Sequence, residues 1–356
     1  MVKFMHLFSK ITLITLVVSG LTACSAKSAA PSTNSQTSQK TVALITDNSG
    51  VDDDSFNESA WQGIKKYAHN HSLSEGPQGY ELFSADNNNQ ITSLVDKVSR
   101  SPFNTIFGVG SNLQSPILTA AKKYPKKNYV LINSSTHHLK NVATANFNTK
   151  QGAYLAGVIA CEMTKTKTIG FIGGMRTKSV IQFEQGFKKG IKDTAKKHHR
   201  NIQILTQYSN SFSNINKTQD LAQDMYNKKA DIIFHAAGKA GSGVFKAARQ
   251  INQANAVNKK VWVIGVDPNQ SNLGNYQAKG GQEANFTLTS VVSRIDLAIN
   301  DIASQTYQKS FPKGRNLQYN LANDGVYLVH NSDIPTHVWI TSQKAKQDII
   351  DKKIKL

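Results

Sequence analysis

Short apolar runs alternate with helix-like stretches along most of the chain, and this alternation constrains the fold more than any other feature. Turn residues bound the runs, and the stretches between them carry apolar residues at helical spacing. In the first half the runs fall at 42–46, 80–85, 105–110, 129–133 and 142–147, and the helical stretches at 60–68, 91–100, 117–124 and 151–163. The pattern predicts a parallel sheet with helices on both faces, because each parallel crossover needs a connection that is usually a helix.

A second series of similar size follows in the same chain. Its runs lie at 169–174, 202–208, 231–237 and 261–267, with helical stretches at 183–198, 220–229 and 244–252. Beyond Asp267 the pattern is irregular, and it resumes at 285–304 and 325–330. We therefore predict an α/β protein of two lobes joined by crossing segments, with a hinged cleft between them. The expected boundaries are 40–147 plus about 288–320 for the N-terminal lobe and 148–287 plus about 321–356 for the C-terminal lobe.

The N-terminus resembles an export signal rather than part of a folded domain. Lys3 and Lys10 precede an apolar run at 11–20, which is too short for a permanent membrane anchor, and the sequence LTAC ends at Cys24. LTAC resembles a bacterial lipobox, so we predict a signal peptide at 1–23, a lipidated Cys24, and a flexible tether through 24–39. The alternative is an ordinary signal peptide that ends near a cysteine. The lipobox interpretation anchors the protein by lipid to the extracytoplasmic face of the bacterial cell membrane.

The chain is strongly basic, with 42 Lys and Arg against 23 Asp and Glu and a formal net charge of +19. A charge of this size can indicate a nucleic-acid partner. Export argues against that partner, and the lysine-rich stretches are scattered and lack the interleaved aromatic residues of single-strand binders. We expect no nucleic acid and interpret these stretches as solvated surface, favourable beside anionic lipid or cell wall.

Residues at the carboxyl ends of the predicted strands form the candidate site, because ligands of parallel α/β sheets bind there. They are Asp47, the loop 52–57, Gly110, Ser111, Asn133, Gly173, Gly174, 209–212, 238–243 and Asp267. The set is rich in carboxylates, amides, glycines and phenylalanines, and poor in catalytic groups. It predicts a pocket for a neutral polar ligand with a flat ring.

Four segments resemble one known family, in order along the chain. They are VALITDNSGVDDDSFNESAWQGIKK at 42–66, GFIGG with FEQGFKKG within 170–190, AAGKAGSGVFKAA at 236–248 followed by WVIGVDPNQ at 262–270, and LTSVVSRIDLAI at 288–299. Together they are similar to the basic membrane protein family of lipoproteins, whose purine nucleoside receptor members feed ABC transporters. The resemblance implies a type I periplasmic-binding-protein-like fold, a nucleoside ligand and an ABC permease as partner. We expect the chain to act as a monomer.

The resemblance also implies how the base is held. Phe56 would stack on one face of the base, and Phe212 on the other. Asp47 and Asn57 would hydrogen-bond to ring or ribose edges. Stacking contributes on the order of 1–3 kcal/mol per face for a nucleobase, so the two phenylalanines would supply affinity and the polar residues orientation.

Two further residues, Gly241 and Asp267, are implied to approach the ribose hydroxyls, and the Asp267 carboxylate can accept two hydrogen bonds. The chain departs from the family at two positions. Relatives often have Asp where Asn133 stands, and Lys where Ser293 precedes Arg294. Because an amide offers both a donor and an acceptor, whereas an ionised carboxylate offers only acceptors, the base preference is expected to differ.

Side chains that react or bind metals are few and poorly placed. Once Cys24 carries lipid only Cys161 remains, in an apolar segment that predicts a buried structural thiol and no disulfide. The adjacent histidines at 137–138 and 198–199 diverge on a helix or strand, and the aspartates at 52–54 lack the spacing of an EF-hand. No catalytic motif is present. We predict no metal, no cofactor and no enzyme activity.

Three alternatives stay open at this point. Phe56 and Phe212 could be core residues, which is the usual place of phenylalanine. A surface adhesin or ligand sensor could use the same fold without transport. A nucleoside hydrolase could use Asp47 and Asp267 as the two carboxylates that such an enzyme needs.

Overall fold

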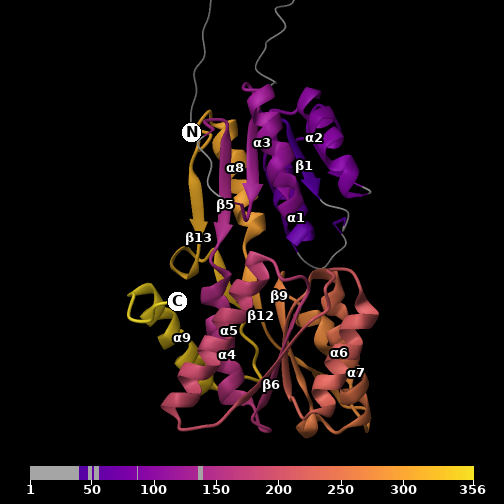
Figure 1. Cartoon of the computed structure of the whole chain (residues 1–356), viewed down its shortest axis with the longest axis vertical. Coiled ribbons are helices and arrows are strands. Elements are labelled where there is room, and N and C mark those ends of the chain that lie inside the picture. Colours follow the sequence, from indigo (N-terminus) through magenta and orange to yellow (C-terminus); the bar gives the residue numbers. More distant parts are fainter. Residues whose placement is uncertain (1–39, 47–49, 52–55, 86, 135–138) are drawn as a thin grey trace, which may run out of the picture. The chain divides into compact units, whose positions relative to one another are not determined.

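The computed structural model describes residues 40–46, 50–51, 56–85, 87–134 and 139–356 (Figure 1). Several predicted features lie outside these residues: the signal peptide, the tether, Cys24, Asp47, the aspartates at 52–54 and the histidines at 137–138. Within the described part of the chain, no helix combines the length and apolar character needed to cross a membrane.

The first sheet forms the centre of the N-terminal lobe and is parallel throughout, with the order β13-β5-β4-β3-β1-β2. Its strands are β1 (Val42–Thr46), β2 (Tyr80–Ser84), β3 (Thr105–Val109), β4 (Asn128–Ile132), β5 (Val142–Phe147) and β13 (Asn316–Tyr319). Its helices are α1 (Phe56–Asn70), α2 (Ile91–Arg100), α3 (Gln114–Lys123) and α8 (Ile295–Tyr307). Alternate residues of β1 pack on opposite faces, Val42 and Leu44 toward α1 and α8, and Ala43 and Ile45 toward α2 and α3. A strand buried on both faces must be apolar throughout, which explains the run VALIT.

The second sheet forms the centre of the C-terminal lobe and repeats this order as β14-β12-β9-β8-β6-β7. Its strands are β6 (Thr168–Gly173), β7 (Gln203–Tyr208), β8 (Ile232–Ala236), β9 (Trp262–Asp267), β12 (Thr287–Ser293) and β14 (Val326–Leu328). The edge strand β14 pairs antiparallel with β12, whereas the other pairs are parallel. Helices α4 (Thr149–Met163) and α5 (Lys178–Lys197) cover one face, and α6 (Ile215–Asn227) and α7 (Ser242–Ala254) cover the other.

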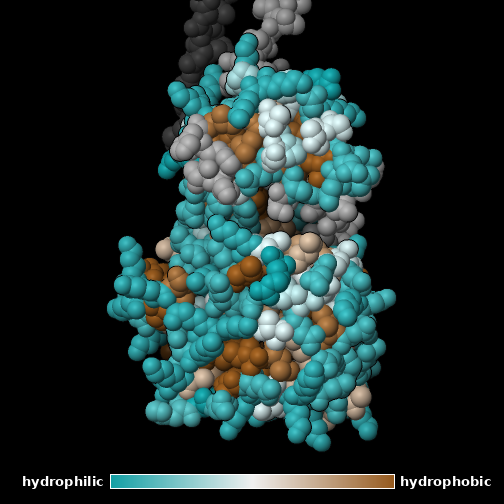
Figure 2. Space-filling model, in the orientation of Figure 1, coloured by the Kyte–Doolittle hydropathy of each residue, from teal (hydrophilic) through white to brown (hydrophobic). Residues whose placement is uncertain are grey.

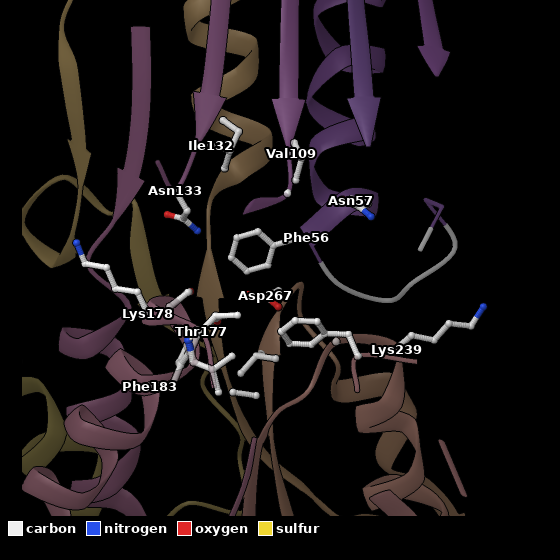
Figure 3. A pocket seen from close by; sticks show the side chains of 17 residues that line it. Phe56, Asn57, Val109, Ile132, Asn133, Thr177, Lys178, Phe183, Lys239 and Asp267 are labelled. Atoms are coloured by element: carbon white, nitrogen blue, oxygen red, sulfur yellow. Dashed lines mark hydrogen bonds between the residues drawn. The ribbon is translucent and has the colours of Figure 1, made fainter. Parts of the chain in front are cut away.

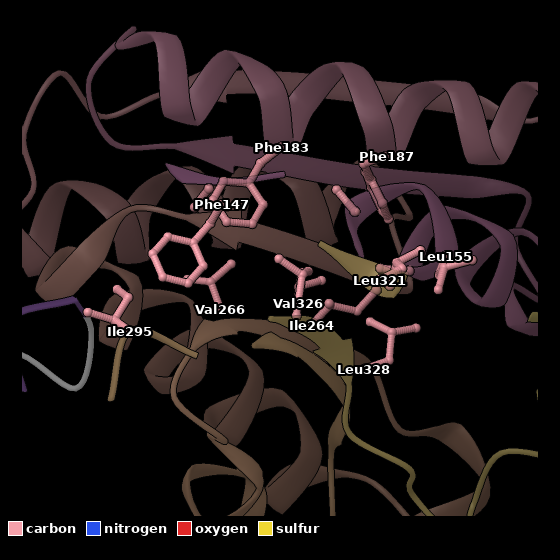
Figure 4. Packing of buried hydrophobic residues seen from close by; sticks show 14 of the residues in the cluster. Phe147, Leu155, Phe183, Phe187, Ile264, Val266, Ile295, Leu321, Val326 and Leu328 are labelled. Carbon is pink, nitrogen blue, oxygen red and sulfur yellow. The ribbon is translucent and has the colours of Figure 1, made fainter. Parts of the chain in front are cut away.

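Smaller elements complete the C-terminal lobe. The strands β10 (Asn275–Gln277) and β11 (Glu283–Asn285) form an antiparallel pair, and α9 (Thr336–Ile350) packs against α4. Hydrophilic side chains cover most of the face shown in Figure 2. The apolar core beneath continues through both lobes. Figure 4 shows part of it, including Phe147, Phe183, Phe187, Val266 and Ile295.

The chain passes between the two sheets at three places: from β5 to α4, from β12 to α8, and from β13 to β14. Two of the crossings are joined, because Phe147 stacks on Tyr319 at 4.9 Å between ring centroids and the Asn148 N–H donates to the Tyr319 carbonyl at 2.8 Å. One predicted boundary differs. Residues 288–293 belong to β12 of the second sheet, so the chain returns to the N-terminal lobe only after Ser293.

Candidate functional site

A pocket of about 230 Å³ lies where the carboxyl ends of the two sheets face each other (Figure 3). The N-terminal lobe contributes Phe56, Asn57, Val109, Gly110, Ile132 and Asn133. The C-terminal lobe contributes Thr177, Lys178, Ser179, Val180, Phe183, Phe212, Ala236, Gly238, Lys239, Val266 and Asp267. The walls are therefore largely apolar, with a few polar groups among them.

The start of α1 places two predicted residues in the pocket. Phe56 is the first residue of the helix, is partly buried, and packs against the core. Asn57 follows it and is only 4% exposed. Because both belong to the first turn of α1, the helix holds them at the edge of the N-terminal lobe that faces the cleft.

Asn133 follows β4 and points an N–H donor into the pocket. Its backbone has φ of +52°, in the left-handed region that asparagine tolerates better than most residues. The Oδ1 atom accepts a hydrogen bond from the Phe147 N–H at 3.1 Å, which fixes the orientation of the amide. Nδ2 is buried and has no hydrogen-bond partner among the described residues, and Figure 3 shows it directed toward Phe56. A ligand acceptor at this point would satisfy it.

Phe212 lies in the loop after β7 on a floor of glycine backbone. A Cβ atom at Gly174 would come within 2.5 Å of the Phe212 ring, and one at Gly238 within 3.5 Å of the Phe212 Cβ. The Ala240 N–H also donates to the Phe212 carbonyl at 2.8 Å. The Phe212 ring can therefore take this position only because Gly174 lacks a Cβ, whereas a Cβ at Gly238 would make an ordinary contact with it.

Asp267 is the last residue of β9 and the only carboxylate among the described residues that line the pocket. It is 4% exposed, and its φ of +68° is again left-handed. Figure 3 shows it between the lobes. Two cations, Lys178 and Lys239, also line the pocket and are themselves exposed.

The first turn of α5 is a part of the pocket that the sequence prediction did not include. The helix begins at Lys178, where the prediction began it at residue 183. Thr177 caps it by accepting a hydrogen bond from the Val180 N–H at 3.3 Å. The Thr at 177, a residue typical of N-caps and placed just before an amphipathic stretch, was the signal for this start.

Not every predicted site residue lines the pocket. Gly241 packs instead against the ring of His235, where a Cβ would lie 2.2 Å from Nδ1, while its neighbours Gly238 and Lys239 line the pocket. Ser293, named above only as a departure from the family, does not line the pocket either: it is fully buried on β12, and its hydroxyl has no hydrogen-bond partner in the described part of the chain. Phe56, Asn57, Asn133, Phe212 and Asp267 do come together in one pocket.

Metal and thiol chemistry have little support in the described residues. They contain no cluster of three or more His, Cys, Asp or Glu able to hold a metal ion. Cys161 is a free, fully buried cysteine, as predicted, and burial raises the pKa of its thiol to about 11. The thiol therefore stays protonated at neutral pH and acts as a packing residue.

Residues 40–356 match the family model Bmp, described as ABC transporter substrate-binding protein PnrA-like. The chain belongs to this family. It is 38% identical over 313 residues to the "ABC transporter nucleoside-binding protein BmpA" of Lactococcus lactis, which covers 88% of each chain. It is 36% identical over 317 residues to a "CD4+ T-cell-stimulating antigen" of Listeria innocua, covering 89% of this chain and 87% of the relative. The resemblance seen in the sequence is confirmed.

Solved structures confirm the fold class as well. A solute-binding protein of an ABC transporter system from Aeropyrum pernix superposes with a TM-score of 0.75, covering 88% of this chain and 92% of that chain at 20% sequence identity. Members of the family are substrate-binding proteins that bind a ligand and interact with a permease, and are not enzymes. They are extracytoplasmic.

Proposed function

We propose that this protein is a lipid-anchored receptor that binds nucleosides, purine nucleosides foremost, and delivers them to an ABC permease. The observation that carries the proposal is the pocket between the lobes, which combines two phenylalanines, Phe56 and Phe212, with the amide of Asn133 and the carboxylate of Asp267. The name of the Lactococcus lactis relative, a nucleoside-binding protein, supports the same ligand class.

A flat heterocycle fits the aromatic residues. Phe56 comes from the N-terminal lobe and Phe212 from the C-terminal lobe, so closure of the lobes would bring one ring to each face of a base. The glycine floor under Phe212 limits how far that ring can move away from a ligand. Each face contributes on the order of 1–3 kcal/mol, which makes stacking the main source of affinity.

The polar groups would set the orientation of the ligand. Asn133 offers the Nδ2 donor to a ring nitrogen or carbonyl oxygen at the edge of the base, since its Oδ1 is already bonded to the Phe147 N–H. Asn57 would serve a second edge position. Asp267 would accept hydrogen bonds from the 2′- and 3′-hydroxyls of ribose, because two adjacent hydroxyl donors match the two oxygens of a carboxylate.

A panel of nucleosides tests the ligand class and separates a receptor from an enzyme. Inosine, adenosine, guanosine, cytidine and uridine are each added to the purified protein, and the melting temperature is measured. Purine nucleosides should raise it most, since a ligand at a hundred times its Kd adds about 2.7 kcal/mol to stability. Chromatography should recover the nucleosides unchanged. Release of free base in proportion to protein would identify a hydrolase instead.

Lipid anchoring is proposed from the LTAC sequence alone and has its own test. Cys24→Ser should release the protein from membranes into the medium or leave it unprocessed, because the other cysteine, Cys161, is buried in the folded domain and is not part of an LTAC sequence. If the variant still associates with membranes and needs detergent for release, the lipid anchor is contradicted. The ligand assignment does not depend on this result.

A further inference from the structure

A buried polar network lies beside Asp267, and of its five residues only Val266 also lines the pocket. The side-chain Oε1 of Gln270 accepts from the main-chain N–H of Val266 at 3.1 Å and lies 3.1 Å from Nε2 of His235. The main chain of Gln270 is held too: its N–H donates to Oγ of Ser290 at 3.1 Å, and its carbonyl accepts from Oγ1 of Thr287 at 3.2 Å. We call His235, Val266, Gln270, Thr287 and Ser290 the Gln270 network.

The network draws on three neighbouring strands and closes the turn that follows β9. His235 is on β8, Val266 is on β9, and Thr287 and Ser290 are on β12. The Gln270 side chain therefore bonds back to Val266, just before the turn 267–270. At the end of the turn, the main chain of Gln270 makes two hydrogen bonds to β12. Asp267 lies inside this closed turn, one residue after Val266, with its left-handed φ of +68°. Such a conformation costs a non-glycine residue on the order of 1 kcal/mol and persists where the surroundings enforce it.

His235 is built to serve as a donor here. Its ring is fully buried, burial lowers its pKa to about 4, and it is therefore neutral at pH 7. Because Oε1 of Gln270 can only accept, the single ring proton lies on Nε2, and Nδ1 faces the backbone of Gly241. The side-chain Oε1 of Gln270 thus accepts from two donors, Nε2 of His235 on β8 and the main-chain N–H of Val266 on β9.

We infer that Gln270 and His235 are positioning residues for Asp267: by closing the turn 267–270 they aim its carboxylate at the ligand. The inference rests on the proposed function, since it assigns Asp267 to the ribose hydroxyls. It predicts that loss of the network weakens recognition of the ribose and leaves recognition of the base intact.

The test compares the affinities of the full chain, purified in detergent, for inosine and 2′,3′-dideoxyinosine, which lacks both ribose hydroxyls. Gln270→Met keeps the length of the side chain and removes its acceptor. It should weaken inosine binding about 10-fold, the scale of a lost or misaligned hydrogen bond to a charged group, and change dideoxyinosine binding less than 2-fold. In an Asp267→Ala background the same substitution should have almost no further effect on inosine.

Asn252→Leu is the matched control. Asn252 is fully buried and makes two side-chain hydrogen bonds to the main chain of Val261, at the other end of β9 and away from the pocket. It should lower the melting temperature and leave the ratio of the two affinities unchanged. Should Gln270→Met fail to fold, Ser290→Ala removes only the acceptor of the Gln270 N–H and should shift the same ratio 2- to 5-fold.

The outcomes separate the two ideas. Wild-type protein that binds neither ligand overturns the proposed function. Wild-type protein that prefers inosine, with a Gln270→Met variant that keeps the full preference or loses affinity for both ligands equally, overturns the inference alone. A loss confined to inosine, and absent without the Asp267 carboxylate, supports it.

Discussion

The two lobes present equivalent positions to the pocket with different chemistry. Counted from the β2 or β7 edge, β4 and β9 occupy the same place in their sheets. Asn133 follows the first and Asp267 ends the second, and both have a positive φ and line the pocket. One is a neutral amide and the other a carboxylate. The shared strand order thus sets where the two groups lie, and the residue at each strand end sets what they recognise.

The two positions also differ in how they are held. Asn133 is oriented through its own side chain, by one hydrogen bond from the Phe147 N–H. Asp267 is oriented through its main chain, by the Gln270 network. The oxygen of an amide can accept a hydrogen bond within the protein while its nitrogen still offers a donor to a ligand. A carboxylate, in contrast, needs both oxygens to bind a vicinal diol.

The largest expected effect is on stability at low pH, and it comes from His235, in the lobe that carries Asp267. The pKa of His235 is about 4 in the folded chain against 6.5 for an ordinary histidine, so between these values the unfolded chain binds a proton that the folded chain does not. Stability should therefore fall as the pH drops from about 6.5 to about 4, by about 3 kcal/mol from this residue. Urea unfolding at a series of pH values measures it. His235→Gln should flatten the slope in that window; identical slopes in both proteins would contradict the assignment.

Loss of a stacking ring should have the next largest effect. Phe56→Ala should weaken nucleoside binding on the order of 10- to 100-fold, with little loss of stability, because the ring is only partly buried. Phe187→Leu changes the fully buried core away from the pocket, so it should lower the melting temperature and leave nucleoside affinity unchanged. Calorimetric titration measures the affinity of both variants, and melting curves measure their stability. A Phe56→Ala protein that is destabilised but binds normally would assign this ring to the core.

Asp267→Asn should have a smaller effect that depends on the sugar. Replacing one acceptor oxygen by a donor should cost inosine about 10-fold in affinity, and 2′,3′-dideoxyinosine much less. Competition binding with the two ligands measures the difference. Equal losses for both would place Asp267 beside the base or in a purely structural role.

The smallest effect is expected at the equivalent position of the other lobe. Asn133→Asp retains the acceptor for the Phe147 N–H and exchanges the donor toward the ligand for an acceptor. One exchanged hydrogen bond corresponds to about 2- to 10-fold. The order of preference among inosine, adenosine and guanosine should therefore change. An unchanged order would show that Asn133 does not contact the base.

The sequence predicted the parts of the fold whose residues are apolar on both faces. The central strands are such runs, and the residues at their ends could therefore be assigned to one site. The edge strand β13, with the polar sequence NLQY, was not predicted, because an edge strand lacks a neighbour on one side and need not be apolar. The boundary near 288 was misplaced because β12 and α8 follow each other with no polar break except Ser293 and Arg294.

The supporting residues of the site could not be predicted at all. Gln270 stands in the turn DPNQ, which by itself indicates only a loop. Its partners are 35 positions earlier, at His235, and 20 later, at Ser290, and only the pairing of three strands brings them together. Asn133 and Asp267, which line the pocket, lie at predictable strand ends, whereas the residues inferred to position Asp267 depend on contacts distant in the sequence.

The most direct test of the central claim is a calorimetric titration of inosine into protein freed of bound ligand by unfolding and refolding. The account predicts one nucleoside per chain, with a Kd of about 1 µM or tighter, corresponding to about 8 kcal/mol, and unchanged inosine afterwards. Absence of binding by inosine and by the other four nucleosides at millimolar concentration, with the protein correctly refolded, would contradict it.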